Sequence, residues 1–219
     1  MAKKKNITSS NMISYYMDYV LEHGEQPKTV YAFAKHHNFE ESKFYEFYGS
    51  FEALEKHIFQ VFFTNSIDAL EKNDDYKNFD ARNQLLSVYF TFFENLTANR
   101  SYVLYALKQH KNKLKGLQAL SELKKTFTSY IEQLDISLIE TKQERIDKIQ
   151  RRALKESAWG QLLLTIKFWM DDTSPAFEKT DIFIEKCVNT SFDILDIAPM
   201  KSLIDLGKFI YKEKIHSFQ

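Results

Sequence analysis

Residues 29–54 constrain the fold more than any other stretch of this 219-residue chain. The stretch contains two short runs in which apolar residues recur at helical spacing, separated by a tight turn at Asn38. Asparagine tolerates the left-handed backbone of such a turn better than any residue except glycine. Gly49 and Ser50 then interrupt the pattern before a further helix. The stretch therefore predicts two short helices joined by a turn.

The rest of the chain is predicted to form longer helices, because only five glycines and three prolines interrupt it. No segment alternates apolar and polar residues over the length of a strand, so the predicted fold class is all-α. Apolar spacing predicts helices at 10–23, 29–37, 40–48, 51–72, 81–96, 102–110, 117–134, 142–170, 176–195 and 199–214, with 73–80 as a polar loop.

Several helix ends are marked by capping residues. Ser9 or Ser10 is expected to cap the first helix, and Gly24 to end it in a left-handed conformation. Thr29 and Ser50 are expected to cap the second and fourth helices. The apolar face of the first helix is predicted to carry Ile13, Met17, Val20 and Leu21.

The balance of charges and the single cysteine limit the classes of protein to which this chain could belong. Thirty basic and 30 acidic side chains cancel, whereas a dedicated nucleic-acid binder usually carries a basic excess. Cys187 is the only cysteine, so it forms no internal disulfide and fits a reducing cytosol. We expect it to pack as a small apolar residue.

No sequence pattern indicates an enzyme, a cofactor or a metal site. The adjacent residues His36 and His37 point to different helix faces, and the six histidines form no metal-binding repeat. Five dispersed glycines build no phosphate-binding loop. No apolar run reaches the roughly 18 residues of a membrane span, and no leader pattern is visible. We therefore expect a soluble, cytoplasmic, non-enzymatic protein without a cofactor or a membrane span.

Residues 24–54 resemble the head of the TetR family of transcriptional regulators. The resemblance rests on Gly24, Thr29-Val30, Phe33-Ala34, Tyr45 and Gly49-Ser50 followed by Glu52-Ala53-Leu54. It implies a three-helix, helix-turn-helix head of the DNA-binding type over residues 1–50. It also implies a body over residues 51–219, in which six or more helices bind a ligand and form a dimer.

The same stretch departs from the family pattern where DNA contact is expected. The turn glycine of the family is Asn38 here, the capping residue of the recognition helix is Glu40, and the lysine after that helix is Phe51. Five acids and two lysines between residues 39 and 56 leave a local charge of −3, which opposes phosphate binding. Residues 1–50 contain no arginine, although lysines at 3–5, 28, 35 and 43 partly compensate. The residues expected to contact DNA are Lys28, Thr29, Ser42, Lys43, Tyr45 and Tyr48.

A shorter segment of the carboxyl half is similar to the COQ-type accessory proteins of ubiquinone biosynthesis. The similarity rests on Trp159, on residues 171–180 and on Phe183. It implies a TetR fold that holds a lipid in its body and does not depend on DNA binding. The alternative is an ordinary helix start, with Asp172 or Ser174 as the cap and Pro175 in the first position.

Bulky apolar side chains occupy five of the six positions 88–93, so this helix is expected to be buried or to line a cavity. Together with aromatic residues elsewhere, it is a candidate pocket for a long apolar ligand or lipid. An ordinary core has the same composition and remains the alternative. The candidate pocket residues are Tyr89, Phe90, Phe93, Tyr102, Tyr105, Phe127, Tyr130 and Trp169.

The TetR resemblance implies a symmetric homodimer, formed by the predicted helices 142–171 and 176–195. The expected interface residues are Ala158, Gly160, Phe168, Phe183, Val188 and Leu195. We therefore interpret the sequence as that of a ligand-responsive regulator that binds operator DNA as a dimer. The alternative interpretation is a TetR-fold protein with a degenerate head that acts as a lipid- or isoprenoid-binding accessory factor.

Overall fold

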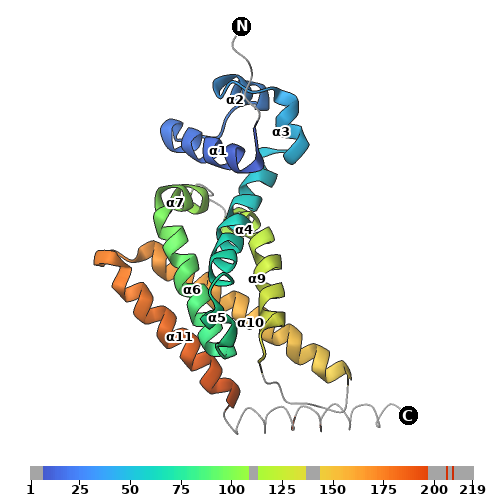
Figure 1. Cartoon of the computed structure of the whole chain (residues 1–219), viewed down its shortest axis with the longest axis vertical. Helices are drawn as coiled ribbons and strands as arrows, with labels where there is room; N and C mark the ends of the chain where they lie inside the picture. Colours follow the sequence, from blue (N-terminus) through green and yellow to red (C-terminus); the bar gives the residue numbers. More distant parts are fainter. Residues whose placement is uncertain (1–6, 109–112, 137–143, 197–205, 207–208, 210–219) are drawn as a thin grey trace. The chain divides into compact units, whose positions relative to one another are not determined.

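The computed structural model describes residues 7–108, 113–136 and 144–196, together with residues 206 and 209. This described part contains eleven α-helices, one short 3-10 helix and no strand (Figure 1). The predicted all-α fold class is therefore confirmed. The lysines at 3–5 and nearly all of the predicted helix at 199–214 lie outside the described residues.

The helices are α1 (Ser9–His23), α2 (Val30–His36), α3 (Glu41–Phe47), α4 (Phe51–Leu70), α5 (Asp74–Asn78), α6 (Ala81–Ala98), α7 (Arg100–Lys108), α8 (Lys113–Ala119), α9 (Ser121–Gln133), α10 (Glu144–Asp171), η1 (Pro175–Phe177) and α11 (Glu178–Asp196). They pack as two compact units, which divide three of the helices between them. The first unit contains residues 1–68 and 92–126, and the second contains residues 69–91 and 127–219.

The helix ends of the first unit follow from local capping interactions. Gly24 ends α1 with a φ of 68°, and Asn38 makes the turn between α2 and α3 with a φ of 58°. The Thr29 hydroxyl accepts the Ala32 backbone N–H at 3.0 Å, and the Ser50 hydroxyl accepts the Ala53 N–H at 3.2 Å. These four predicted ends are confirmed.

The start and the buried face of α1 differ from the prediction. Thr8 caps the helix, because its hydroxyl accepts the Asn11 N–H while the Asn11 side chain accepts the Thr8 N–H. Neither Ser9 nor Ser10 takes that position. The buried side chains are Met12, Ile13, Tyr16 and Val20, whereas Met17 is half-buried and Leu21 is exposed.

Three further segments depart from the predicted helices. The predicted polar loop contains α5, which Asn73 caps through the Asp75 N–H at 2.9 Å. The single helix predicted over 117–134 is instead α8 and α9, separated at Leu120, which is buried. The segment before α11 begins with η1, in which Ala176 has a φ of 51° and Phe177 a φ of 61°.

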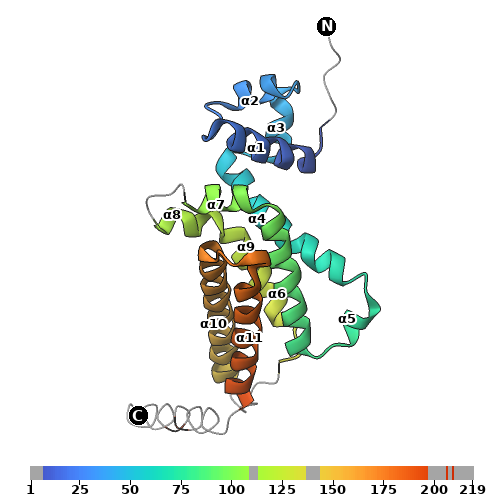
Figure 2. The ribbon, with the colours of Figure 1, turned by 90° about the vertical axis from the view of Figure 1, so that its left-hand side faces the viewer.

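Aromatic side chains fill much of both cores. Tyr16, Phe33, Phe44, Phe59, Phe63, Phe92 and Tyr102 are buried in the first unit, and Tyr89, Phe127 and Trp169 are buried in the second. In the second unit α10 and α11 pack against each other (Figure 2). They diverge with distance from the turn that joins them (Figure 1).

Candidate functional site

Four of the residues expected to contact DNA lie on the surface of the head. Lys28, Ser42 and Tyr45 are exposed, and 55% of Tyr45 is accessible to solvent. Thr29 is also exposed, although its hydroxyl is engaged in capping α2. These side chains come from the start of α2 and from α3, the two helices of the predicted helix-turn-helix.

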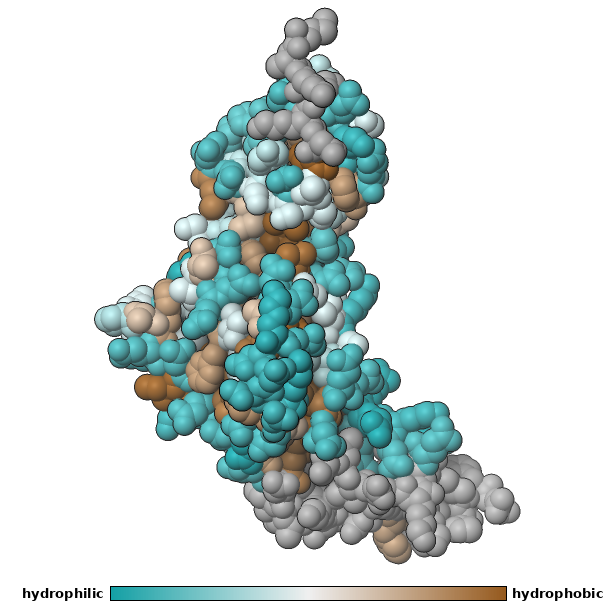
Figure 3. Space-filling model, in the orientation of Figure 1, coloured by the Kyte–Doolittle hydropathy of each residue, from teal (hydrophilic) through white to brown (hydrophobic). Residues whose placement is uncertain are grey.

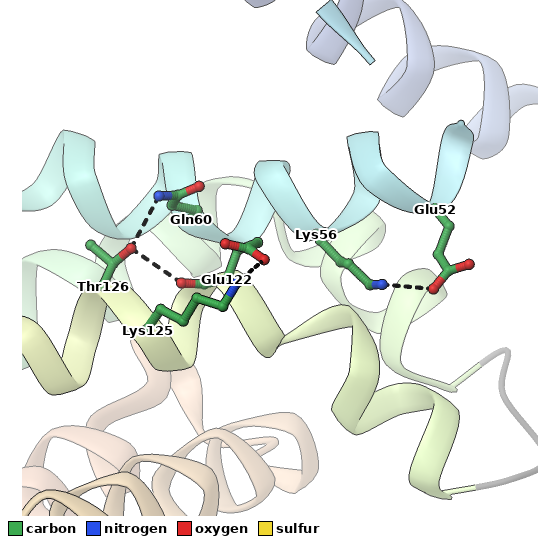
Figure 4. Close-up of polar contacts among 6 residues, drawn as sticks. All are labelled: Glu52, Lys56, Gln60, Glu122, Lys125 and Thr126. Atoms are coloured by element: carbon green, nitrogen blue, oxygen red, sulfur yellow. Dashed lines mark hydrogen bonds and ion pairs between the residues drawn. The ribbon is translucent and has the colours of Figure 1, made fainter. Parts of the chain in front are cut away.

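Both lysines between residues 39 and 56 form ion pairs with acids of the same stretch. The Lys43 ammonium lies 2.9 Å from a Glu46 carboxylate oxygen, and the Lys56 ammonium lies 2.7 Å from Glu52 (Figure 4). Exposed pairs of this kind contribute little to folding stability. They do reduce the positive charge that these lysines offer to a phosphate.

Tyr48 lies in the interior of the head and not on its surface. Only 6% of the residue is exposed, and its hydroxyl lies 2.6 Å from the Ser9 Oγ and 2.8 Å from the His57 Nδ1. Burial raises the pKa of Tyr48, and burial also lowers the pKa of His57 against the opposing charge of Glu122. Tyr48 thus connects α1 to α4 and is not available as a surface contact.

A second hydrogen bond connects the same two helices. The Tyr16 hydroxyl donates to Glu55 at 2.5 Å and accepts from the Gln26 amide at 3.3 Å. Burial, together with the negative charge of Glu55, raises the pKa of Tyr16. Further along α4, the Gln60 amide donates to the Thr126 hydroxyl of α9 at 3.1 Å (Figure 4). Side-chain hydrogen bonds therefore connect α1, α4 and α9 within the first unit.

The eight candidate pocket residues are divided between the two units. Phe93, Tyr102 and Tyr105 belong to the first unit, and Tyr89, Phe90, Phe127, Tyr130 and Trp169 belong to the second. Most are buried, whereas Phe90 and Tyr105 are half-buried. The Tyr130 hydroxyl lies 3.0 Å from that of Tyr76, and burial raises the pKa of both. None of the eight lines the cavity described next.

The second unit contains an open cavity of about 710 Å³, lined mainly by residues of α10 and α11. Leu85 of α6 and Ile131 of α9 contribute to its wall, together with Leu154 of α10 and Leu195 of α11. The lining residues that the sequence did not single out are apolar ones such as Leu85 and Leu154, and polar ones such as Gln161 and Lys186. No local signal in the sequence distinguishes these positions from other positions of the predicted helices.

Four of the six expected interface residues line this cavity, namely Ala158, Gly160, Phe183 and Leu195. Of the other two, Phe168 stacks on Phe183 with ring centroids 4.3 Å apart, and Val188 is fully buried. Cys187 is half-buried and also lines the cavity, and burial raises the pKa of its thiol.

Hydrophobic side chains are also exposed along α11 and on the neighbouring helix. Ile182 and Ile194 of α11 are 50% and 44% exposed, and Leu164 of α10 is 57% exposed. Figure 3 shows such side chains among the hydrophilic surface of this unit. Leu164 and Ile194 also line the cavity. An exposed apolar surface of this kind is typical of a site that binds another molecule.

The family described as "Tetracyclin repressor-like, C-terminal domain" matches residues 84–210. This match covers more than half of the chain. The protein belongs to the TetR family. No curated protein matches the chain.

The matched region contains every residue that lines the cavity between α10 and α11. In TetR-like proteins this domain is commonly a body that binds a ligand and forms a dimer, and the family is typically non-enzymatic. Within the described residues of this TetR-like chain, no group of histidine, cysteine or acidic side chains is arranged to hold a metal ion. The same residues contain no helix of the length and hydropathy that a bilayer crossing requires.

Proposed function

We propose that this TetR-like protein is a ligand-responsive transcriptional regulator that binds operator DNA as a homodimer in the cytoplasm. Residues 1–50 would form the DNA-binding head, and residues 51–219 the body that binds an apolar effector and a second copy. The family match over residues 84–210 carries this proposal. The helix α2, capped by Thr29, and the helix α3 after the turn at Asn38 support it in the head.

The proposed DNA surface consists of Lys28, Thr29, Ser42, Lys43 and Tyr45. The family geometry would place α3 in the major groove, with the start of α2 near the phosphate backbone. Tyr48 is left out of this surface because its ring is buried. The ion pair between Lys43 and Glu46 would have to open before Lys43 reaches a phosphate, so we expect Lys28 to contribute more to affinity.

The proposed dimer forms through the exposed apolar side chains of α10 and α11. Leu164, Ile182 and Ile194 would be buried against a second copy, and Gly160 would allow close approach of the helices. An effector that binds one arrangement of the dimer more tightly would change the spacing of the two heads by a population shift. The hydrogen bonds of Tyr16 and Tyr48 to α4 support a path from body to head.

The test is retention of the DNA duplex upstream of the protein's own gene, titrated from low to physiological salt. We expect specific retention that falls steeply with salt. Lys28→Ala should weaken retention about threefold to tenfold and reduce the salt dependence, since it removes one phosphate contact. The matched control is Lys77→Ala, an exposed lysine of α5, which should leave retention unchanged.

One observation favours a second function, that of a lipid-binding accessory factor with a degenerate head. The two lysines between residues 39 and 56 are paired with Glu46 and Glu52, which leaves this region acidic. Absence of specific retention even at low salt would reject the regulator and favour this function. Mass spectrometry of molecules that co-purify with the protein would then be the next measurement.

A further inference from the structure

The cavity between α10 and α11 has the size and chemistry of a site for a small amphiphile. Its volume of about 710 Å³ lies within the range of roughly 300–1,000 Å³ that is usual for ligand pockets. Leu85, Ile131 and Leu154 give it an apolar wall drawn from three helices, and Phe192 and Leu195 add the wall from α11. A long hydrocarbon chain would bury its surface against these residues.

Gln161 provides one hydrogen-bond donor in this apolar setting. Its Oε1 accepts the Ser191 hydroxyl at 2.7 Å, which fixes the side-chain amide between α10 and α11. The Nε2 of the same amide is shielded from solvent and has no hydrogen-bond acceptor among the described residues. Because a buried donor without an acceptor is costly, a ligand that supplies an oxygen here would gain binding free energy.

The charges of the side chains that line the cavity indicate which polar head group a bound amphiphile would carry. Lys186 is exposed and lines the cavity, and no aspartate or glutamate is among the lining residues of the described chain. Asp193, on the same helix as Lys186, accepts a hydrogen bond from Arg82 at 2.7 Å. The site therefore favours an anionic head group over a neutral or a cationic one.

We propose that this cavity binds a long-chain carboxylate. The chain would lie against Leu85, Ile131 and Leu154, and one carboxylate oxygen would accept from the Gln161 Nε2 while Lys186 supplies the opposite charge. This proposal rests on the proposed function, for which it names the effector class and its site. The ligand lies at the face proposed for the second copy, so its occupancy is coupled to dimer formation.

The test is calorimetric titration of the delipidated full-length protein with hexadecanoate below its micelle concentration. Gln161→Leu retains the size of the side chain and removes the donor, and it should weaken binding about tenfold. Gln133→Leu is the matched control, because Gln133 is exposed and does not line the cavity, and it should bind as the wild type does. Lys186→Met should weaken binding of hexadecanoate but not of its uncharged methyl ester.

Two outcomes would overturn this assignment. One is the absence of hexadecanoate binding by a protein that retains operator DNA and forms a dimer in sedimentation velocity, which would leave the cavity to the second copy. The other is equal binding by the wild type and Gln161→Leu. Failure of operator retention together with tight hexadecanoate binding would reject the proposed regulator and leave the site standing.

Discussion

Asp172 is the one acidic side chain that is buried in the described part of the chain, and it organises the turn between α10 and α11. One of its carboxylate oxygens accepts from the backbone N–H and hydroxyl of Ser174 at 2.8 and 2.7 Å. The other accepts from the N–H and hydroxyl of Thr180 at 2.9 and 2.7 Å. Burial by itself would raise the pKa of Asp172. The four hydrogen bonds outweigh this effect and lower the pKa to about 2.

We expect Asp172→Asn to reduce the free energy of unfolding by about 2 kcal/mol. The amide nitrogen of asparagine cannot accept hydrogen bonds, so either the two from Ser174 or the two from Thr180 would be lost. The native pKa of Asp172 lies below the ordinary value of 3.8, so its contribution is complete above that value. The contribution is lost as the pH falls towards about 2. Urea unfolding of both proteins across this range measures the difference.

The neighbouring residue provides the control for this prediction. Asp171 is exposed and forms a surface ion pair with Lys167, so Asp171→Asn should change stability by less than about 0.5 kcal/mol. An unchanged unfolding midpoint in Asp172→Asn at neutral pH would show that the turn does not depend on this carboxylate.

At the scale of the helices, the sequence predicts the ends that depend on local chemistry. Gly24, Thr29, Asn38 and Ser50 act through their own backbone or hydroxyl groups, so each is recognisable from its residue type. The separation of α8 from α9 is different, because it occurs at Leu120, which is buried, and not at a glycine or a proline. The packing of Leu120 in the core determines this helix boundary. Such packing involves residues far apart in the sequence, so the local sequence does not predict it.

Arg82 connects the start of α6 to the end of α11. One guanidinium nitrogen donates to Asp193 at 2.7 Å, another lies 3.5 Å from the Asn189 Oδ1, and the group lies 5.4 Å from the centre of the Phe192 ring. A lysine has neither the two-pronged geometry nor the flat surface for stacking. We expect Arg82→Lys to cost about 1 kcal/mol of stability.

Hydrogen exchange provides the local measurement for Arg82. The amides in the last turns of α11 should exchange faster in Arg82→Lys than in the wild type. Arg152→Lys, at an exposed position of α10, is the control and should exchange as the wild type does. Unaltered exchange in α11 would mean that its other contacts hold the helix by themselves.

For the whole molecule, the sequence predicted the fold class and the family but could not locate the pocket. Tyr89, Phe127 and Trp169 were candidates because large apolar side chains are shared by cores and cavities, and the structure buries all three. The cavity is instead lined by residues of α6, α9, α10 and α11, which only the packing of these helices brings together. The site residues themselves stay a prediction until binding is measured.

Dimerisation is the property of the whole molecule that one substitution tests most directly. Leu164→Glu would place a charge in the proposed interface, and a buried charge without a partner is strongly unfavourable. We expect sedimentation velocity to show a monomer of this variant at micromolar concentration and a dimer of the wild type, as proposed above. Leu117→Glu, at a residue of α8 that is 46% exposed, should leave the dimer intact.

The hydrogen bonds of Tyr16 and Tyr48 to α4 affect whether residues 1–50 could be joined to the body of another protein. Ser9, Glu55 and His57 complete these bonds, so the first 50 residues share their polar interior with the helix that follows. A chimera that joined these 50 residues to another body would remove Glu55, which accepts from the Tyr16 hydroxyl, and His57, one of the two hydrogen-bond partners of Tyr48. Transfer of the proposed DNA-binding head to another body would therefore require Glu55 and His57 to move with it.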